Sequence, residues 1–190
     1  MSVSVNTPCG EIIGLQCEGY QEFRGIPYAE QPIGVARFKA PEPLLPFDEP
    51  FKAERFGDSA PQDKIPLFGI NHTSEDCLYL NIWTPASDDK KRPVMVWIHG
   101  GGYLTGSGSQ LIYNGRSLAM SGDVVVISIN YRLGALGFLY LNDLISADHG
   151  ISANNGLLDQ IEALRWVRNN IASFGGDPGD ITLFGESAGA

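Results

Sequence analysis

Two nearly uninterrupted apolar runs constrain the fold of this chain more than any other feature of its sequence. They read PVMVWIHG at residues 93–100 and DVVVISINYR at residues 123–132, and polar or glycine-rich turns bound each of them. Runs of this kind are typical of strands that are buried on both faces, as in parallel sheets covered by helices. The two runs therefore predict the centre of an α/β sheet.

Neighbouring segments supply the rest of such a sheet. YLNIWTP at residues 79–85 and ITLFG at residues 181–185 are predicted to be further strands. Over residues 155–174 apolar side chains recur at helical spacing, and GGDP then ends the pattern. The expected apolar face of this helix consists of Leu157, Ile161, Leu164, Val167 and Ile171. From Pro93 onward the order is strand, segment, strand, helix, strand, and right-handed crossovers then predict a parallel sheet.

The first part of the chain has a different character. Short mixed runs within residues 1–29, such as GEIIGLQ and YQEFRGIPYA, predict an antiparallel hairpin at an edge of the sheet, outside the core. Residues 31–70 are rich in Pro, Phe and charge, so we expect an ordered loop there. The length of 190 residues suits one domain with a sizeable core.

Composition argues against several classes of partner. A formal net charge of -9 disfavours nucleic acid and anionic membrane surfaces. No apolar run reaches the length of a membrane span, and the first residues lack the pattern of a secretory signal. Cys9, Cys17 and Cys77 form an odd, sparse set that is untypical of a disulfide framework. We therefore expect reduced thiols and a cytoplasmic protein, and give little weight to the glycosylation triplet at Asn71.

The pentapeptide GESAG at residues 185–189 directly follows a predicted strand. A Gly-x-Ser-x-Gly sequence in this position is typical of a nucleophile elbow, in which a sharp turn exposes the serine hydroxyl. Small residues at Gly185 and Gly189 allow that turn. The sequence thus indicates Ser187 as a candidate nucleophile.

A second motif, HGGGY at residues 99–103, also follows a predicted buried strand. Its glycines leave backbone N–H groups bare, and such groups form the oxyanion hole of lipases and esterases together with the N–H that follows the nucleophile. We therefore interpret Gly101, Gly102 and Ala188 as the oxyanion donors. This chemistry requires neither a metal nor an organic cofactor.

The two motifs belong to a longer series: FRGIPYAEQPIGVARFKAPEP, SEDCLYLNIWTP, VWIHGGGY, YRLGALGF, NNGLLDQIEALRWVRNNIASFGGDP and ITLFGESAGA. In order and content this series resembles the type-B carboxylesterases, a family that includes p-nitrobenzyl esterases and cholinesterases. The resemblance implies the N-terminal portion of an α/β-hydrolase fold. It comprises an N-terminal hairpin and parallel strands with crossover helices, and it ends at the elbow.

The resemblance also implies roles for individual residues. It makes Ser187 the nucleophile, with Gly101, Gly102 and Ala188 as oxyanion donors, and it makes Glu186 a buried polar support. It implies two structural ion pairs, Arg37 with Glu75 and Arg132 with Asp159. In secreted members of the family Cys77 pairs with an upstream cysteine, and this chain has none at that place.

The family's acid and histidine follow the serine in the sequence, and only three residues follow Ser187 here. His72, His99 and His149 all precede it, and the resemblance gives only His99 a place, a structural one. We therefore expect a fragment of a serine esterase for small neutral esters that is inactive without the missing C-terminal portion. The alternatives are a non-catalytic binding or adhesion protein on the same scaffold and a naturally truncated, inactive product.

Overall fold

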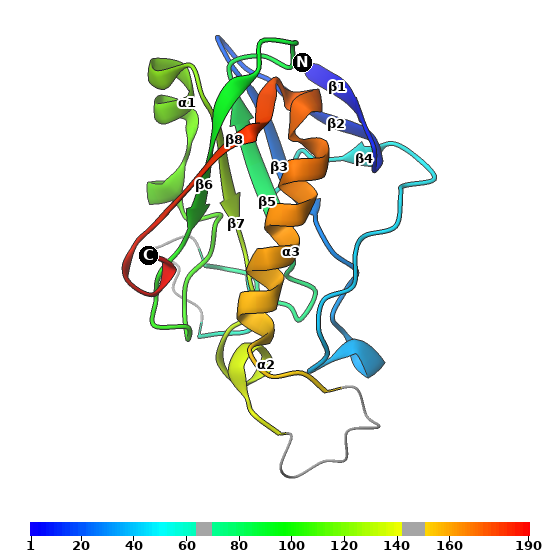
Figure 1. The fold of residues 1–190 in the computed structure, drawn as a ribbon, viewed down its shortest axis with the longest axis vertical. Helices are drawn as coiled ribbons and strands as arrows, with labels where there is room; N and C mark the ends of the chain where they lie inside the picture. Colours follow the sequence, from blue (N-terminus) through cyan, green and yellow to red (C-terminus); the bar gives the residue numbers. More distant parts are fainter. Residues whose placement is uncertain (64–69, 142–150) are drawn as a thin grey trace.

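The computed structural model describes residues 1–63, 70–141 and 151–190. The strands are β1 (Ser2–Thr7), β2 (Gly10–Gln16), β3 (Gln21–Pro27), β4 (Phe51–Lys52), β5 (Tyr79–Thr84), β6 (Arg92–Ile98), β7 (Val125–Ile129) and β8 (Gly176–Gly185). The helices are α1 (Arg116–Gly122), α2 (Gly134–Phe138) and α3 (Asn155–Asn170), with short 3-10 turns at Gly34–Ala36, Leu111–Tyr113, Ile171–Phe174 and Ser187–Gly189. The strands of the described residues form one eight-stranded sheet, in which β4 pairs only with β2, beside the main strand order. Figure 1 shows the long helix α3 lying across this sheet.

The parallel centre that the sequence predicts is confirmed. Strand β6 pairs in parallel with β7 on one side and with β8 on the other, so the order across the sheet is β1-β2-β3-β5-β7-β6-β8. Strand β5 is antiparallel to both β3 and β7, which makes the sheet mixed. The ends of β6 and β8 lie next to each other, because Ile98 is in register with Gly185.

The N-terminal strands depart from the prediction in their depth. Strands β2 and β3 form the expected antiparallel hairpin, and β1 extends it by one strand at the edge of the sheet. Strand β3, however, pairs with β5, and its Phe23 and Ile26 are fully buried in the main core. Placing the whole hairpin outside the core was therefore wrong, because β3 is an interior strand.

Alternating side chains of the central strands serve two separate clusters. Val125, Ile127 and Ile129 of β7 join the main core together with the buried side of α3. Val126 belongs instead to a smaller cluster that contains Ala119 of α1. Because successive side chains of a strand point to opposite faces, α1 and α3 cover opposite faces of the sheet.

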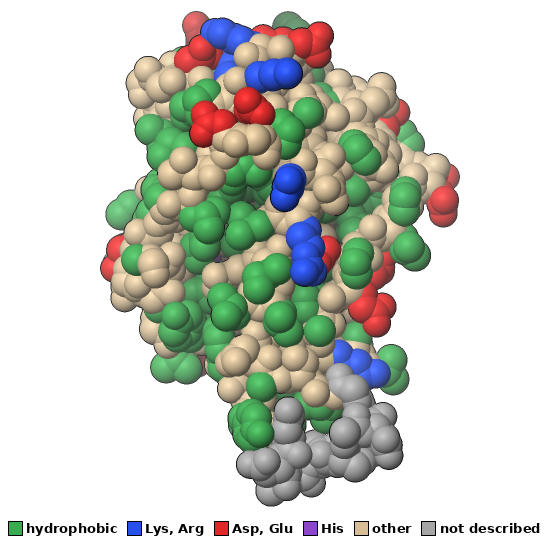
Figure 2. Space-filling model, viewed as in Figure 1, with side chains coloured by type: hydrophobic (Ala, Val, Ile, Leu, Met, Phe, Trp, Pro, Cys, Tyr) green, Lys and Arg blue, Asp and Glu red, His purple; other side chains and the backbone are tan. Residues whose placement is uncertain are grey.

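The predicted helix is confirmed over residues 155–174 as α3 and the 3-10 turn after it. Its predicted apolar face is only partly right, because Leu157 and Ile161 are 51% and 38% exposed. The residues of α3 that are buried are Asn155, Gly156, Asp159, Glu162, Ala163, Trp166, Val167 and Asn170. The helix thus turns a smaller and more polar face to the sheet. Figure 2 shows hydrophobic side chains exposed in the middle of the molecular surface on the side where α3 lies.

Two short helices, α1 and α2, lie in segments for which the sequence predicted no element. Within residues 31–70, the described part is mostly loop, as expected, with one 3-10 turn and the two-residue strand β4. None of the helices in the described residues is long and apolar enough to cross a membrane.

Candidate active site

Ser187 lies on a tight turn immediately after β8. Its φ angle is +55°, in the left-handed region that a serine rarely adopts, and its side chain is exposed. The Gly189 N–H donates to the Glu186 carbonyl at 2.9 Å, which closes the turn. A Cβ atom at Gly185 would lie 2.1 Å from the Gly189 carbonyl oxygen, so the turn requires a glycine there. This geometry is that of a nucleophile elbow.

The glycine-rich loop starts where β6 ends. Gly101, Gly102 and Tyr103 have φ angles of +107°, +60° and +61°, so three successive residues adopt left-handed conformations. The Gly101 carbonyl accepts hydrogen bonds from the N–H groups of Leu104 and Thr105, both at 3.1 Å. Gly101 and Gly102 are exposed, and neither backbone N–H is engaged in a hydrogen bond among the described residues. Free N–H groups in this arrangement are able to bind a substrate oxygen.

The loop and the elbow meet at one end of the sheet. They follow the neighbouring parallel strands β6 and β8, whose last residues are in register. A Cβ atom at Gly100 would lie 3.1 Å from Ser187 Cβ and 2.5 Å from Glu186 Oε2. The structure thus places the loop that contains Gly101 and Gly102 beside the elbow that contains Ser187 and Ala188, with Gly100 as the point of contact. Glu186, which the resemblance implied to be a buried polar support, is exposed, although Gly100 approaches its side chain closely.

His99 occupies the core beneath the loop. It is 1% exposed, its Nδ1 lies 2.8 Å from the Gly100 carbonyl oxygen, and burial lowers its pKa to about 4. The described residues provide no hydrogen-bond partner for the Ser187 hydroxyl, and His72 is exposed in a loop. His149 lies outside the described residues. His99 therefore has a structural position, as the resemblance implied, and forms no hydrogen bond with Ser187 in the described structure.

The two ion pairs differ strongly in burial. Arg37 Nε and Nη2 lie 2.5 and 2.6 Å from the two oxygens of the Glu75 carboxylate, in an exposed bidentate ion pair. Arg132 contacts Asp159 through Nε, Nη2 and its backbone N–H at 2.8, 2.6 and 3.0 Å, and both side chains are buried. Burial raises the pKa of Asp159, and the hydrogen bonds from Arg132 oppose that rise. This pair joins α3 to the segment after β7 and has a structural role.

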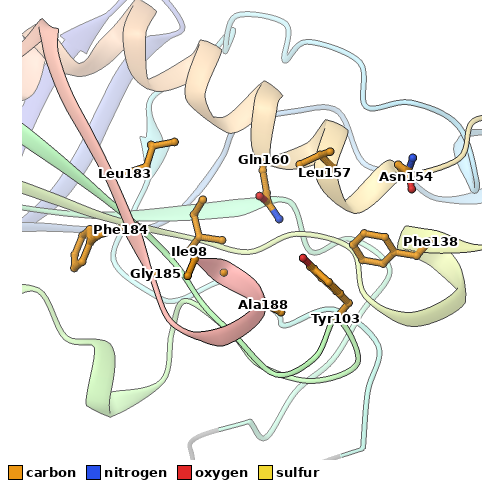
Figure 3. A pocket seen from close by; sticks show the side chains of 12 residues that line it. Ile98, Tyr103, Phe138, Asn154, Leu157, Gln160, Leu183, Phe184, Gly185 and Ala188 are labelled. Atoms are coloured by element: carbon orange, nitrogen blue, oxygen red, sulfur yellow. The ribbon is translucent and has the colours of Figure 1, made fainter.

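A cavity of about 820 Å³ opens beside the elbow. Figure 3 shows Leu157 and Gln160 of α3, Leu183 of β8, and the rings of Tyr103 and Phe138 around it. The centroids of those two rings are 4.8 Å apart. The sequence analysis assigned none of these residues to a cavity, although it identified Leu157 as part of an apolar helix face. Among the described residues, no group of three or more His, Cys, Asp or Glu side chains is placed to hold a metal ion.

Comparisons with known proteins agree with this geometry. Residues 1–190 match the family described as the Carboxylesterase family. The chain is 47% identical to the para-nitrobenzyl esterase of Bacillus subtilis (strain 168) and to the phenmedipham hydrolase of Pseudarthrobacter oxydans, over 97% of its length in each case. It spans only 38% and 37% of those two proteins.

Solved structures give the same result. A carboxylesterase from Geobacillus stearothermophilus superposes with a TM-score of 0.91 at 50% identity, covering 98% of this chain and 38% of that one. A p-nitrobenzyl esterase structure superposes with a TM-score of 0.89 at 47% identity, over 98% of this chain and 38% of that one. The predicted α/β-hydrolase fold, in its N-terminal portion, is confirmed. The chain belongs to the carboxylesterase family.

Proposed function

We propose that this chain is the N-terminal part of a single catalytic domain of a serine carboxylesterase. The observation that carries the proposal is the left-handed turn at Ser187, placed against the glycine-rich loop at Gly100. In a hydrolase of this type the serine oxygen attacks the ester carbonyl and the alcohol leaves, which forms an acyl-enzyme. Water then releases the carboxylic acid and restores the serine.

Three backbone groups are proposed to stabilise the reaction. The N–H groups of Gly101, Gly102 and Ala188 point their positive ends at the oxygen that becomes negative when the carbonyl is attacked. The substrate is proposed to be a small neutral ester, since the chain carries a net charge of -9 that disfavours anions. This choice is also supported by two relatives, which are named a para-nitrobenzyl esterase and a phenmedipham hydrolase. The reaction is proposed to need no metal or organic cofactor.

The base and the acid of the triad are proposed to come from sequence downstream of Ala190. Three features support this: the relatives are much longer, Leu157 and Leu183 are half exposed beside the elbow, and β8 has a strand on one side only in the described structure. The same downstream part would then cover the apolar surface and pair with β8. We also propose a cytoplasmic location, consistent with free thiols at Cys9, Cys17 and Cys77.

A fluorophosphonate probe tests the proposal, because it reacts only with an activated serine. The protein to use is the full-length gene product, which contains these residues and the sequence that follows them. We expect stoichiometric labelling of the wild type and hydrolysis of short-chain p-nitrophenyl esters. Ser187→Ala should abolish both, whereas Ser121→Ala, on the exposed side of α1, should change neither. Labelling that persists in Ser187→Ala would exclude Ser187 as the nucleophile.

A further inference from the structure

Gln62 holds the glycine-rich loop from outside with both ends of its side-chain amide. Its Nε2 donates to the Gly106 carbonyl at 2.7 Å, and the Gly106 N–H donates to its Oε1 at 2.7 Å. Nε2 also donates to the Ala60 carbonyl at 3.0 Å, which ties the amide to its own segment. The side chain therefore pairs with Gly106 as a neighbouring strand would, across 44 residues of sequence.

Gly106 links Gln62 to the start of the loop, because it packs directly against His99 and Gly100. A Cβ atom at Gly106 would lie 2.3 Å from His99 Nδ1 and 2.6 Å from the Gly100 carbonyl oxygen, so the two ends of the loop are in direct contact. The φ angle of Gly106 is +114°, a conformation that favours glycine. A shift of Gly106 would thus displace the Gly100 carbonyl, which belongs to the same peptide group as the Gly101 N–H.

The loop needs such support because of its own composition. Residues 99–106 contain Gly101, Gly102, Tyr103 and Gly106 in left-handed conformations, and glycine loses the most conformational entropy when it is fixed. Two other hydrogen bonds reach these residues from outside in the described structure: Tyr131 Oη to the His99 carbonyl and the Gly134 N–H to the Tyr103 carbonyl. At the far end Gln62 holds Gly106 itself, and Asn130 Oδ1 accepts from the Ser107 hydroxyl and the Gly108 N–H that follow it.

We propose that Gln62 is a positioning residue that fixes the shape of the glycine-rich loop, residues 99–106, through Gly106. The assignment rests on the proposed function, because it gives the loop its catalytic purpose. Gln62 does not line the cavity beside the elbow, and among the described residues its side chain bonds to backbone groups. Its effect on the reaction is therefore indirect: it keeps the Gly101 and Gly102 N–H groups aimed at the site where the oxyanion forms, before substrate arrives.

Gln62→Met in the full-length protein tests the proposal, because methionine keeps the length of the side chain and removes both hydrogen bonds with Gly106. Gln21→Met is the matched control. Gln21 Oε1 also holds a distant loop, accepting from the Ser87 N–H at 2.8 Å and the Ser87 hydroxyl at 2.7 Å, at the opposite end of β6 from the glycine-rich loop. Both variants should lower the melting temperature to a similar extent.

The two variants should differ in catalysis and in loop protection. We expect Gln62→Met to lower kcat for a p-nitrophenyl ester on the order of 10-fold, with KM little changed, because the donors act mainly on the transition state. Gln21→Met should leave kcat at the wild-type value. Amide hydrogen exchange in peptides covering residues 99–106 should accelerate in Gln62→Met alone.

Equal kcat values and equal exchange in the two variants would overturn the proposal. The failure of the proposed function has a different signature, namely a wild-type protein without esterase activity. Hydrogen exchange then decides the role of Gln62 by itself: faster exchange at residues 99–106 in Gln62→Met supports the hold on the loop, and unchanged exchange refutes it.

Discussion

Tyr131 lies flat against His99 and holds the backbone of the same residue. The two rings are 4.5 Å apart and inclined by 16°, and the Tyr131 hydroxyl donates to the His99 carbonyl at 2.8 Å. Because His99 is the first residue after β6, this contact fixes the point at which the glycine-rich loop leaves the sheet. It also keeps the imidazole away from water, which explains the lowered pKa of His99.

Burial of His99 predicts a loss of stability in mild acid. Its pKa in the folded chain is about 4, below the ordinary value of 6.5, so the unfolded chain binds the proton first. His99 should therefore contribute a fall in unfolding free energy of roughly 1.4 kcal/mol per pH unit as the pH drops from 6.5 towards 4. Urea unfolding of the wild type and His99→Gln across this range measures it. A constant difference between the two proteins would show that His99 titrates normally.

The two ion pairs should contribute very differently to stability. Asp159→Ala strands the buried Arg132 guanidinium, and we expect it to lower the unfolding free energy by about 3 to 5 kcal/mol. Glu75→Ala breaks an exposed pair with Arg37 and should leave the denaturation midpoint almost unchanged. Chemical denaturation of the full-length protein compares them, and equal losses would contradict the difference in burial.

The elbow should not tolerate a single methyl group. A Cβ atom at Gly189 would lie 2.1 Å from the Ile98 carbonyl oxygen, a backbone atom that cannot turn aside. Gly189→Ala should therefore displace Ser187 and reduce its labelling by a fluorophosphonate at least about 10-fold. Gly122→Ala in α1 is the control, since its Cβ would meet Val124 at an ordinary 3.4 Å. Equal labelling rates in the two variants would mean that the turn relaxes without moving Ser187.

The 190-residue chain alone should show neither fluorophosphonate labelling nor ester turnover above that of the buffer. His99 is buried with a lowered pKa and forms no hydrogen bond with Ser187 in the described structure, and the turn that carries Ser187 ends at Ala190. Both activities should return when the downstream portion is supplied. Stoichiometric labelling of the purified chain would show instead that a histidine within residues 1–190 serves as the base.

Local sequence patterns predicted the parts of the site that depend on neighbours in the chain. The turn at Ser187 and the bare N–H groups of Gly101 and Gly102 follow from short motifs placed after strands. Gln62 and Tyr131 were missed, since each contacts the loop from more than 30 residues away in the sequence. Tyr131 begins the YRLGALGF segment, but that local pattern does not report its contact with His99.

Burial was harder to predict than element type. Periodicity identified α3 and correctly buried Val167, but it also assigned Leu157 and Ile161 to the buried face. The sheet packs instead against Ala163 and Trp166, which the predicted face did not include. The depth of β3 was missed for a related reason. Its interior place depends on pairing with β5, which lies about 50 residues later, and no local pattern reports that pairing.

The supports of the glycine-rich loop have a consequence for the order of events during synthesis. Gln62, Tyr131 and Gly134, which hold residues 99–106, all leave the ribosome well before Ser187. Since chains begin to fold from the N-terminus as they emerge, at roughly 5 to 20 residues per second, these three hydrogen-bonding partners of the loop are available seconds before the nucleophile exists. Strand β8 and the turn at Ser187 are therefore added beside a β6 whose loop already has its hydrogen bonds to Gln62, Tyr131 and Gly134, and the packing of Gly100 against Glu186 and Ser187 remains to form.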